Sequence, residues 1–141
     1  MTNAMQEYTE ANVAGVGQLK LIIMLYEGAR RFLLQAHDCI EKKQTMEAHE
    51  YLIKAKRIIV HFLCTTNPES SELAANLHKL YVFLYEKIAR ANMCKSLDET
   101  EAALRILNKL LEGWKELHGT STPNMPPHPS PENVRTLSIQ A

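Results

Sequence analysis

The chain has 141 residues and a mass of 16.0 kDa, which is enough for one compact domain but not for two enzymatic domains. Hydrophobic residues make up 45% and charged residues 23%, a balance that excludes collagen-like and wholly disordered chains. The 16 basic and 16 acidic residues give a formal net charge of zero, so no overall field attracts nucleic acid or an anionic membrane.

Residues 1–16 are expected to form an N-terminal arm, because their apolar periodicity is weak and Gly15 and Gly17 interrupt it. The stretch up to Glu10 has no Lys or Arg and so lacks the basic start of a secretory signal. The longest apolar run, residues 21–25, is far shorter than a membrane span requires. We therefore expect a cytosolic protein that does not insert into a membrane.

Four helices are predicted after the arm, because residues 29–112 contain no glycine and a single proline. The first covers about residues 18–42, where apolar side chains recur three and four apart. It is expected to bury one stripe and to carry a second apolar line beside it. The predicted stripe is Ile22, Leu25, Ala29, Phe32, Ala36 and Ile40, and the second line is Leu19, Ile23, Tyr26 and Leu33.

The second helix is predicted over about residues 46–64. The third is expected to begin where Asn67 caps it and Pro68 takes the first helical position. Its predicted buried stripe is Leu73, Leu77, Leu80, Leu84 and Ile88, with Ala74, Tyr81 and Tyr85 as a second line.

The fourth helix is predicted to begin at Ser96, which would form a capping box with Glu99, and to end at Gly119. Short connections force neighbouring helices to run antiparallel, so residues 17–119 are expected to form an all-α, up-down-up-down four-helix bundle. Five prolines fall between residues 123 and 131, so residues 120–141 are expected to be a disordered tail.

The polar residues of these helices match no metal-binding or phosphate-binding motif. No Glu stands three residues before a His, His49-Glu50 does not continue to a second His, and no phosphate-binding glycine loop occurs. The three cysteines are widely separated and are expected to be reduced. The sequence thus predicts no enzyme, no cofactor and no metal, although a histidine phosphotransfer module using His78 remains an alternative.

Basic pairs at Arg30-Arg31, Lys42-Lys43 and Lys56-Arg57 have acidic residues nearby, so they are interpreted as solvated helix faces and not as a nucleic-acid site. The second apolar lines are more informative. A bundle helix normally hides about three residues in seven, and the first and third helices offer more. Some of this surface is expected to bind a partner helix laid in a groove.

A set of residues with matching spacings resembles the flagellin export chaperones of the FliS family. The resemblance covers about residues 8–117 and rests on the combination of its elements. These elements are Tyr8-x4-Val13, then Leu21-Ile22-x-Met24-Leu25-Tyr26-Glu27-Gly28, Leu80-Tyr81, Ala91-Asn92 and Trp114.

The resemblance implies a chaperone of the bacterial cytosol that serves flagellar type III secretion. Such a chaperone would bind the disordered C-terminal segment of flagellin, prevent its premature polymerisation and dock on the cytoplasmic domain of the export gate. Weak self-association is expected for a separate reason, because a chain with zero net charge has little electrostatic protection against it. The partner-binding residues implied by the resemblance are Tyr8, Val13, Leu21, Leu25, Tyr26, Leu80 and Tyr81. Tyr8 and Val13 would belong to the arm, and the others would shape the bundle and its groove.

Overall fold

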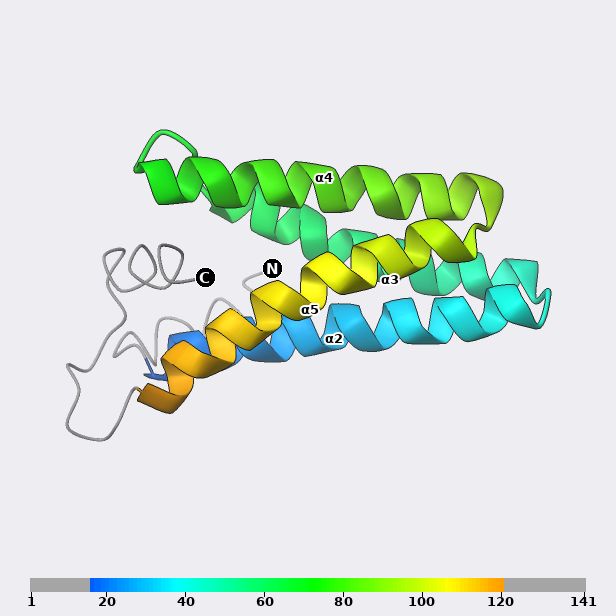
Figure 1. Ribbon diagram of the computed structural model, residues 1–141, viewed down its shortest axis with the longest axis horizontal. Coiled ribbons are helices and arrows are strands. Elements are labelled where there is room, and N and C mark those ends of the chain that lie inside the picture. The colour runs from blue at the N-terminus through cyan, green and yellow to red at the C-terminus, as the bar shows by residue number, and fades with distance from the viewer. Residues whose placement is uncertain (1–15, 121–141) are drawn as a thin grey trace, which may run out of the picture.

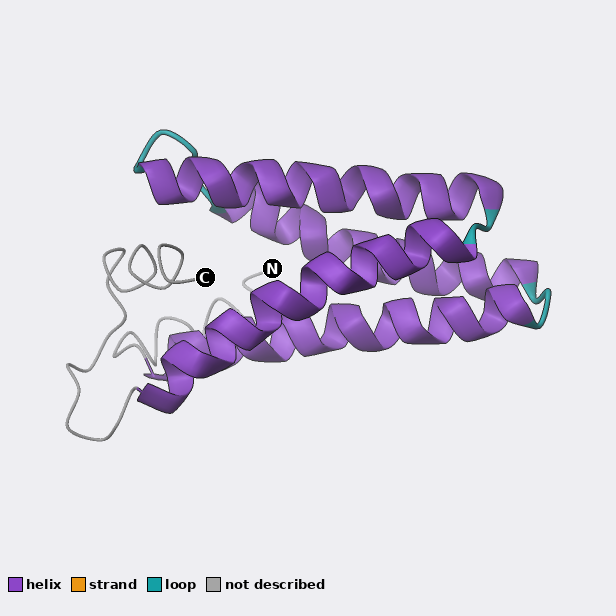
Figure 2. Ribbon diagram, in the orientation of Figure 1, coloured by secondary structure: helices purple, strands orange, loops and turns teal. Residues whose placement is uncertain are grey.

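The computed structural model describes residues 16–120, which form an all-α bundle without strands (Figure 1, Figure 2). Its helices are α2 (Val16–Glu41), α3 (Thr45–Thr65), α4 (Glu72–Cys94) and α5 (Leu97–Thr120). Helices that follow one another run in opposite directions, and α5 returns to pack on α2. The pairs α2/α4 and α3/α5 lie diagonally across the bundle. The predicted all-α, up-down-up-down bundle is confirmed.

The predicted start of the third helix is wrong. The helix begins at Glu72, and the hydroxyl of Ser71 accepts a hydrogen bond from the N–H three residues on, at 3.0 Å. The Asn67 side chain instead accepts from the N–H of Glu69 at 3.0 Å, which closes a local turn containing Pro68. An Asn side chain can either close a turn or cap a helix, and here the Asn67 side chain closes the turn.

The predicted capping box at the start of α5 is half present. The N–H of Glu99 donates to the Ser96 hydroxyl at 3.1 Å, as expected of the cap. The Glu99 carboxylate does not return to the Ser96 N–H, which donates instead to the carbonyl of Ala91 at 3.0 Å. That carboxylate accepts a hydrogen bond from Lys87 of α4 at 2.9 Å. One half of the box is therefore replaced by a contact between helices.

The buried face of α2 is wider than the predicted stripe. The line expected to flank the core, which contains Tyr26 and Leu33, is buried. Of the predicted stripe, the small Ala29 and Ala36 are buried, whereas the larger side chains Ile22, Leu25, Phe32 and Ile40 are half-buried. A helix in this bundle packs against two neighbours and buries a broad face, so periodicity alone does not identify its centre. On α4 the predicted stripe is buried except at Leu80, which is exposed, and the neighbouring Tyr81 is buried instead.

Each helix contributes one aromatic ring to the middle of the core, and we call Tyr26, Phe62, Tyr81 and Trp114 the aromatic centre. The Phe62 ring lies 4.9 Å from the Tyr26 ring and 5.4 Å from the Tyr81 ring, and Trp114 lies 6.1 Å from Tyr26. The hydroxyls of Tyr26 and Tyr81 are hydrogen-bonded at 2.6 Å, which joins the diagonal helices α2 and α4. The aromatic centre therefore fixes the register of all four helices.

The two buried hydroxyls titrate at unusually high pH. Burial raises the pKa of Tyr81 to about 12, and the hydrogen bond between Tyr81 and Tyr26 has a smaller, opposing effect. Burial, followed by repulsion from Tyr81, also raises the pKa of Tyr26 well above its usual value near 10. The pair is consequently neutral at physiological pH, and each hydroxyl has the polar partner that burial requires.

Candidate partner-binding surface

Helix α4 presents the largest share of the exposed apolar surface. Within residues 16–120, eight large hydrophobic side chains are exposed, of which four lie on α4 and none on α5. The four on α4 are Leu80, Val82, Phe83 and Met93. Exposed apolar side chains that gather on one element are typical of a site for another protein.

Leu80 and Phe83 lie on the side of α4 that faces α5. Lys87, four residues after Phe83, pairs with Glu99 of α5 at 2.9 Å, and its ammonium lies 5.2 Å from the centre of the Phe83 ring. Residues three and four apart share a face of a helix, so Leu80 and Phe83 continue the line that Lys87 begins. Their exposed fractions are 38% and 44%.

Helix α5 supplies the other side of this surface. Ile106 and Leu110 follow Glu99 at helical spacing, are half-buried and pack against the core. We call Leu80, Phe83, Ile106 and Leu110 the apolar seam. The ribbons of α4 and α5 diverge from their connection toward the opposite end of the bundle, and of the four neighbouring helix pairs this one is the least extensively packed (Figure 1).

The chemistry of the apolar seam favours binding over catalysis. Exposed aliphatic and aromatic side chains at positions i and i+3 can receive the apolar face of a helix. At one end of the seam, the hydrogen bond from Lys87 lowers the pKa of Glu99, so this carboxylate stays ionised and paired at neutral pH. Among residues 16–120, no group of His, Cys, Asp and Glu side chains could hold a metal ion.

The structure separates the residues expected to bind a partner. Tyr8 and Val13 lie outside the described residues. Leu21 and Leu25 are half-buried on α2, which lies diagonally across the bundle from α4. Leu80 belongs to the apolar seam.

The remaining two expected residues, Tyr26 and Tyr81, are brought together in the aromatic centre. Tyr81 is only 2% exposed and Tyr26 is fully buried. Both rings are therefore enclosed by the bundle and are not part of its exposed surface.

Three residues of the apolar seam, Phe83, Ile106 and Leu110, were not predicted from the sequence, and Phe83 is the most exposed of them. Phe83 belonged to neither apolar line predicted for this helix. The structure replaces Leu80 by Tyr81 in the buried stripe and leaves both Leu80 and Phe83 exposed. The signal that could have found it is the i, i+3 spacing of these two residues.

Comparison with known proteins gives a consistent result. The family model described as flagellar protein FliS matches residues 1–121. A flagellar secretion chaperone FliS from Campylobacter jejuni is 32% identical over 114 residues, covering 79% of this chain and 88% of the relative. Those from Salmonella typhimurium and Bacillus subtilis are each 28% identical, covering 79% and 78% of this chain and 84% and 80% of the relatives.

No helix within residues 16–120 is long and apolar enough to cross a membrane.

Proposed function

This chain belongs to the flagellar protein FliS family, and from that premise we propose that it binds the C-terminal segment of flagellin in the cytosol. The family is one of flagellar secretion chaperones and not of enzymes, so the phosphotransfer alternative at His78 is set aside. By covering the flagellin segment, the chaperone prevents premature polymerisation before export. The observation that carries the proposal is the apolar seam.

The physical basis of binding is coupled folding. A disordered flagellin segment that becomes helical can place apolar side chains on Leu80 and Phe83, and the buried area offsets the entropy lost in ordering the segment. Anchors spaced three and four residues apart on the flagellin helix would match the spacing of Leu80 and Phe83. Binding should depend weakly on salt, because the surface is apolar.

Delivery to the export gate is assigned to the arm. We propose that Tyr8 and Val13 cover apolar surface in the empty chaperone and are released when flagellin binds, so that Tyr8 becomes free to contact the gate. A tethered segment needs little intrinsic affinity, because its effective concentration is high. Leu21 and Leu25, half-buried on α2, would form the part of the bundle nearest the arm in sequence.

Calorimetry with the isolated flagellin C-terminal segment tests the proposed function. We expect calorimetry to show one-to-one binding with a negative heat-capacity change. Circular dichroism of the same mixture should show a gain of helix. Absence of binding, or an affinity that collapses at modest salt, contradicts coupled folding on an apolar surface.

Substitutions test whether the apolar seam is the site. Phe83→Asp and Leu80→Asp should each weaken flagellin binding roughly tenfold or more, because a charge is buried without a partner. Leu34→Asp is the matched control, since Leu34 is 45% exposed on α2 and receives the same charge. An equal loss in the control would place the flagellin site elsewhere.

Deletion of residues 1–14 tests the arm. It should strengthen flagellin binding several-fold, promote weak self-association of the empty chaperone and weaken docking of the loaded complex on the gate. The covering role is contradicted if flagellin affinity is unchanged and Tyr8 is equally protected in footprinting with and without flagellin.

A further inference from the structure

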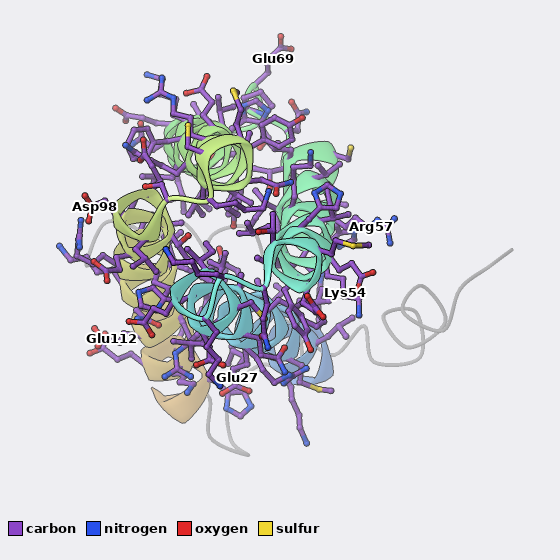
Figure 3. The ribbon with its side chains drawn as sticks, turned by 90° about the vertical axis from the view of Figure 1, so that its right-hand side faces the viewer. Glu27, Lys54, Arg57, Glu69, Asp98 and Glu112 are labelled. Carbon is purple, nitrogen blue, oxygen red and sulfur yellow. The ribbon has the colours of Figure 1, made fainter. Side chains whose placement is uncertain are left out.

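Positive charge gathers on the side of the bundle formed by α2 and α3. Arg31 of α2 and Lys54 and Arg57 of α3 are exposed, and we call them the basic cluster. Lys54 and Arg57 project from one side of the bundle, with Asp98 and Glu112 on the other (Figure 3). Among the described residues, none of the three cations lies within 4 Å of a carboxylate.

The carboxylates best placed to neutralise this charge do not do so. Glu27 precedes Arg31 by four residues, a spacing that favours an ion pair on a helix. Its carboxylate instead pairs with Lys115 of α5 at 2.9 Å. Glu50 stands in the same relation to Lys54 and forms no ion pair in the described structure. The charges that the sequence would pair within each helix therefore remain available.

Two aromatic rings hold two of these cations in place. The Phe32 ring of α2 lies 6.3 Å from the Tyr51 ring of α3, across the interface between these two helices. The Arg31 guanidinium lies 5.6 Å from the centre of the Phe32 ring. The Lys54 ammonium lies 5.7 Å from Phe32 and 5.6 Å from Tyr51. Cation–π contacts of this kind restrict long side chains and so lower the entropy lost when they bind a ligand.

We propose that the basic cluster binds an acidic segment of a partner protein. Carboxylates would pair with Arg31 and Lys54, and an apolar side chain between them would rest on the half-buried rings of Phe32 and Tyr51. A protein segment fits better than a nucleic acid, because a chain of phosphates needs a continuous basic track. Here Glu27 and Glu50 border the cluster, and the net charge of the chain is zero.

The position of the basic cluster sets it apart from the apolar seam. The α2–α3 side and the α4–α5 side lie on opposite flanks of the bundle, since the helices contact one another in ring order. An acidic partner and a helix on the apolar seam would therefore not overlap. This surface goes beyond the proposed flagellin site and does not depend on it.

The test uses the full chain and a fluorescein-labelled peptide of repeated Glu-Glu-Leu, with a repeated Gln-Gln-Leu peptide as its uncharged counterpart. The acidic peptide should bind at least tenfold more tightly than the uncharged one, and its affinity should fall as salt is raised. Arg31→Gln combined with Lys54→Gln should weaken binding of the acidic peptide roughly tenfold. Both side chains are exposed, so the variant should retain its helical circular dichroism.

The matched control is Arg105→Gln combined with Lys109→Gln, which removes the same charge from exposed positions of α5. This control and Phe83→Asp should each change the affinity for the acidic peptide less than about twofold. An equal loss in the α5 control would show general electrostatic attraction and overturn the proposal. It is also overturned if the two peptides bind alike, or if an RNA oligonucleotide binds more tightly than the acidic peptide and loses affinity in the Arg31→Gln, Lys54→Gln variant.

Discussion

The aromatic centre and the apolar seam use neighbouring residues of α4 for opposite purposes. Tyr81 is 2% exposed, stacks on Phe62 and shares a hydrogen bond with Tyr26. Leu80, the preceding residue, is 38% exposed and faces the side of α5. A rotation of about 100° per residue around a helix is enough to separate a group that holds the bundle from one that can hold a partner.

Stability and binding should therefore respond to different substitutions in this fold. Groups of the aromatic centre contact several helices, so truncating one leaves a cavity. Groups of the apolar seam are already partly hydrated, so truncating one costs little in the isolated protein.

Trp114→Ala should lower the free energy of unfolding by about 3 to 5 kcal/mol, the range for removing a large buried aromatic side chain. Trp114 lies on α5, the last helix of the bundle, and is buried beside Tyr26 of α2. Urea unfolding followed by circular dichroism measures the loss. A change below about 1 kcal/mol would mean that Trp114 belongs to a binding surface, and the separation of stability from binding would fail.

High pH should lower the free energy of unfolding through the two buried tyrosines of the aromatic centre. In the unfolded chain both tyrosines lose a proton near pH 10, whereas burial raises the pKa of Tyr81 to about 12 in the folded protein. The contribution of Tyr81 to the free energy of unfolding is therefore fully present below pH 10 and is lost as the pH rises toward 12. For this pKa shift the loss is about 2 to 3 kcal/mol. Denaturant unfolding as a function of pH measures it. The Tyr26→Phe, Tyr81→Phe double variant should lose most of this dependence.

Tyr81→Phe should cost about 1 to 2 kcal/mol, because it removes the hydrogen bond between the two buried hydroxyls. The double variant with Tyr26→Phe should cost less than the sum of the single changes, since each single change already removes that hydrogen bond. Urea unfolding of all four proteins completes the cycle. Strict additivity would show that the 2.6 Å contact contributes nothing to folding.

Phe83→Ala should give the smallest change in stability, below about 1 kcal/mol, because the ring is 44% exposed. Its effect should appear in flagellin binding instead. Thermal unfolding and calorimetry on the same preparation provide both quantities. A loss of stability as large as that of Trp114→Ala would place Phe83 in the core and remove the apolar seam as a candidate site.

Much of the fold could be predicted from particular residues. The absence of glycine between residues 29 and 112, together with apolar spacings of three and four, indicates long helices. Short connections then leave an antiparallel bundle as the simple arrangement. The start of α4 was misplaced because Asn67 can cap a helix or close a turn with equal ease, and only the hydrogen bond from Glu69 decides between them.

The candidate site was predicted less well. Leu80 was identified through the family resemblance, but Tyr26 and Tyr81 were grouped with it although they are buried. Phe83 was not identified, because its exposure depends on the rotation of α4 about its own axis. The basic cluster was interpreted as a solvated face. The acids Glu27 and Glu50 lie close in sequence, yet neither pairs with it.

The sequence by itself determined the four helices, their antiparallel order and the family of the protein, because these follow from local spacing and from matching residues along the chain. Only the tertiary structure decided which apolar residues of α2 and α4 lie at the centre of the core and which lie at its margin. That choice depends on how two neighbouring helices fit against each face, and one helical period is compatible with several rotations. The same fit leaves Leu80 and Phe83 exposed. It also pairs Glu27 with Lys115 of α5 and not with Arg31 of its own helix.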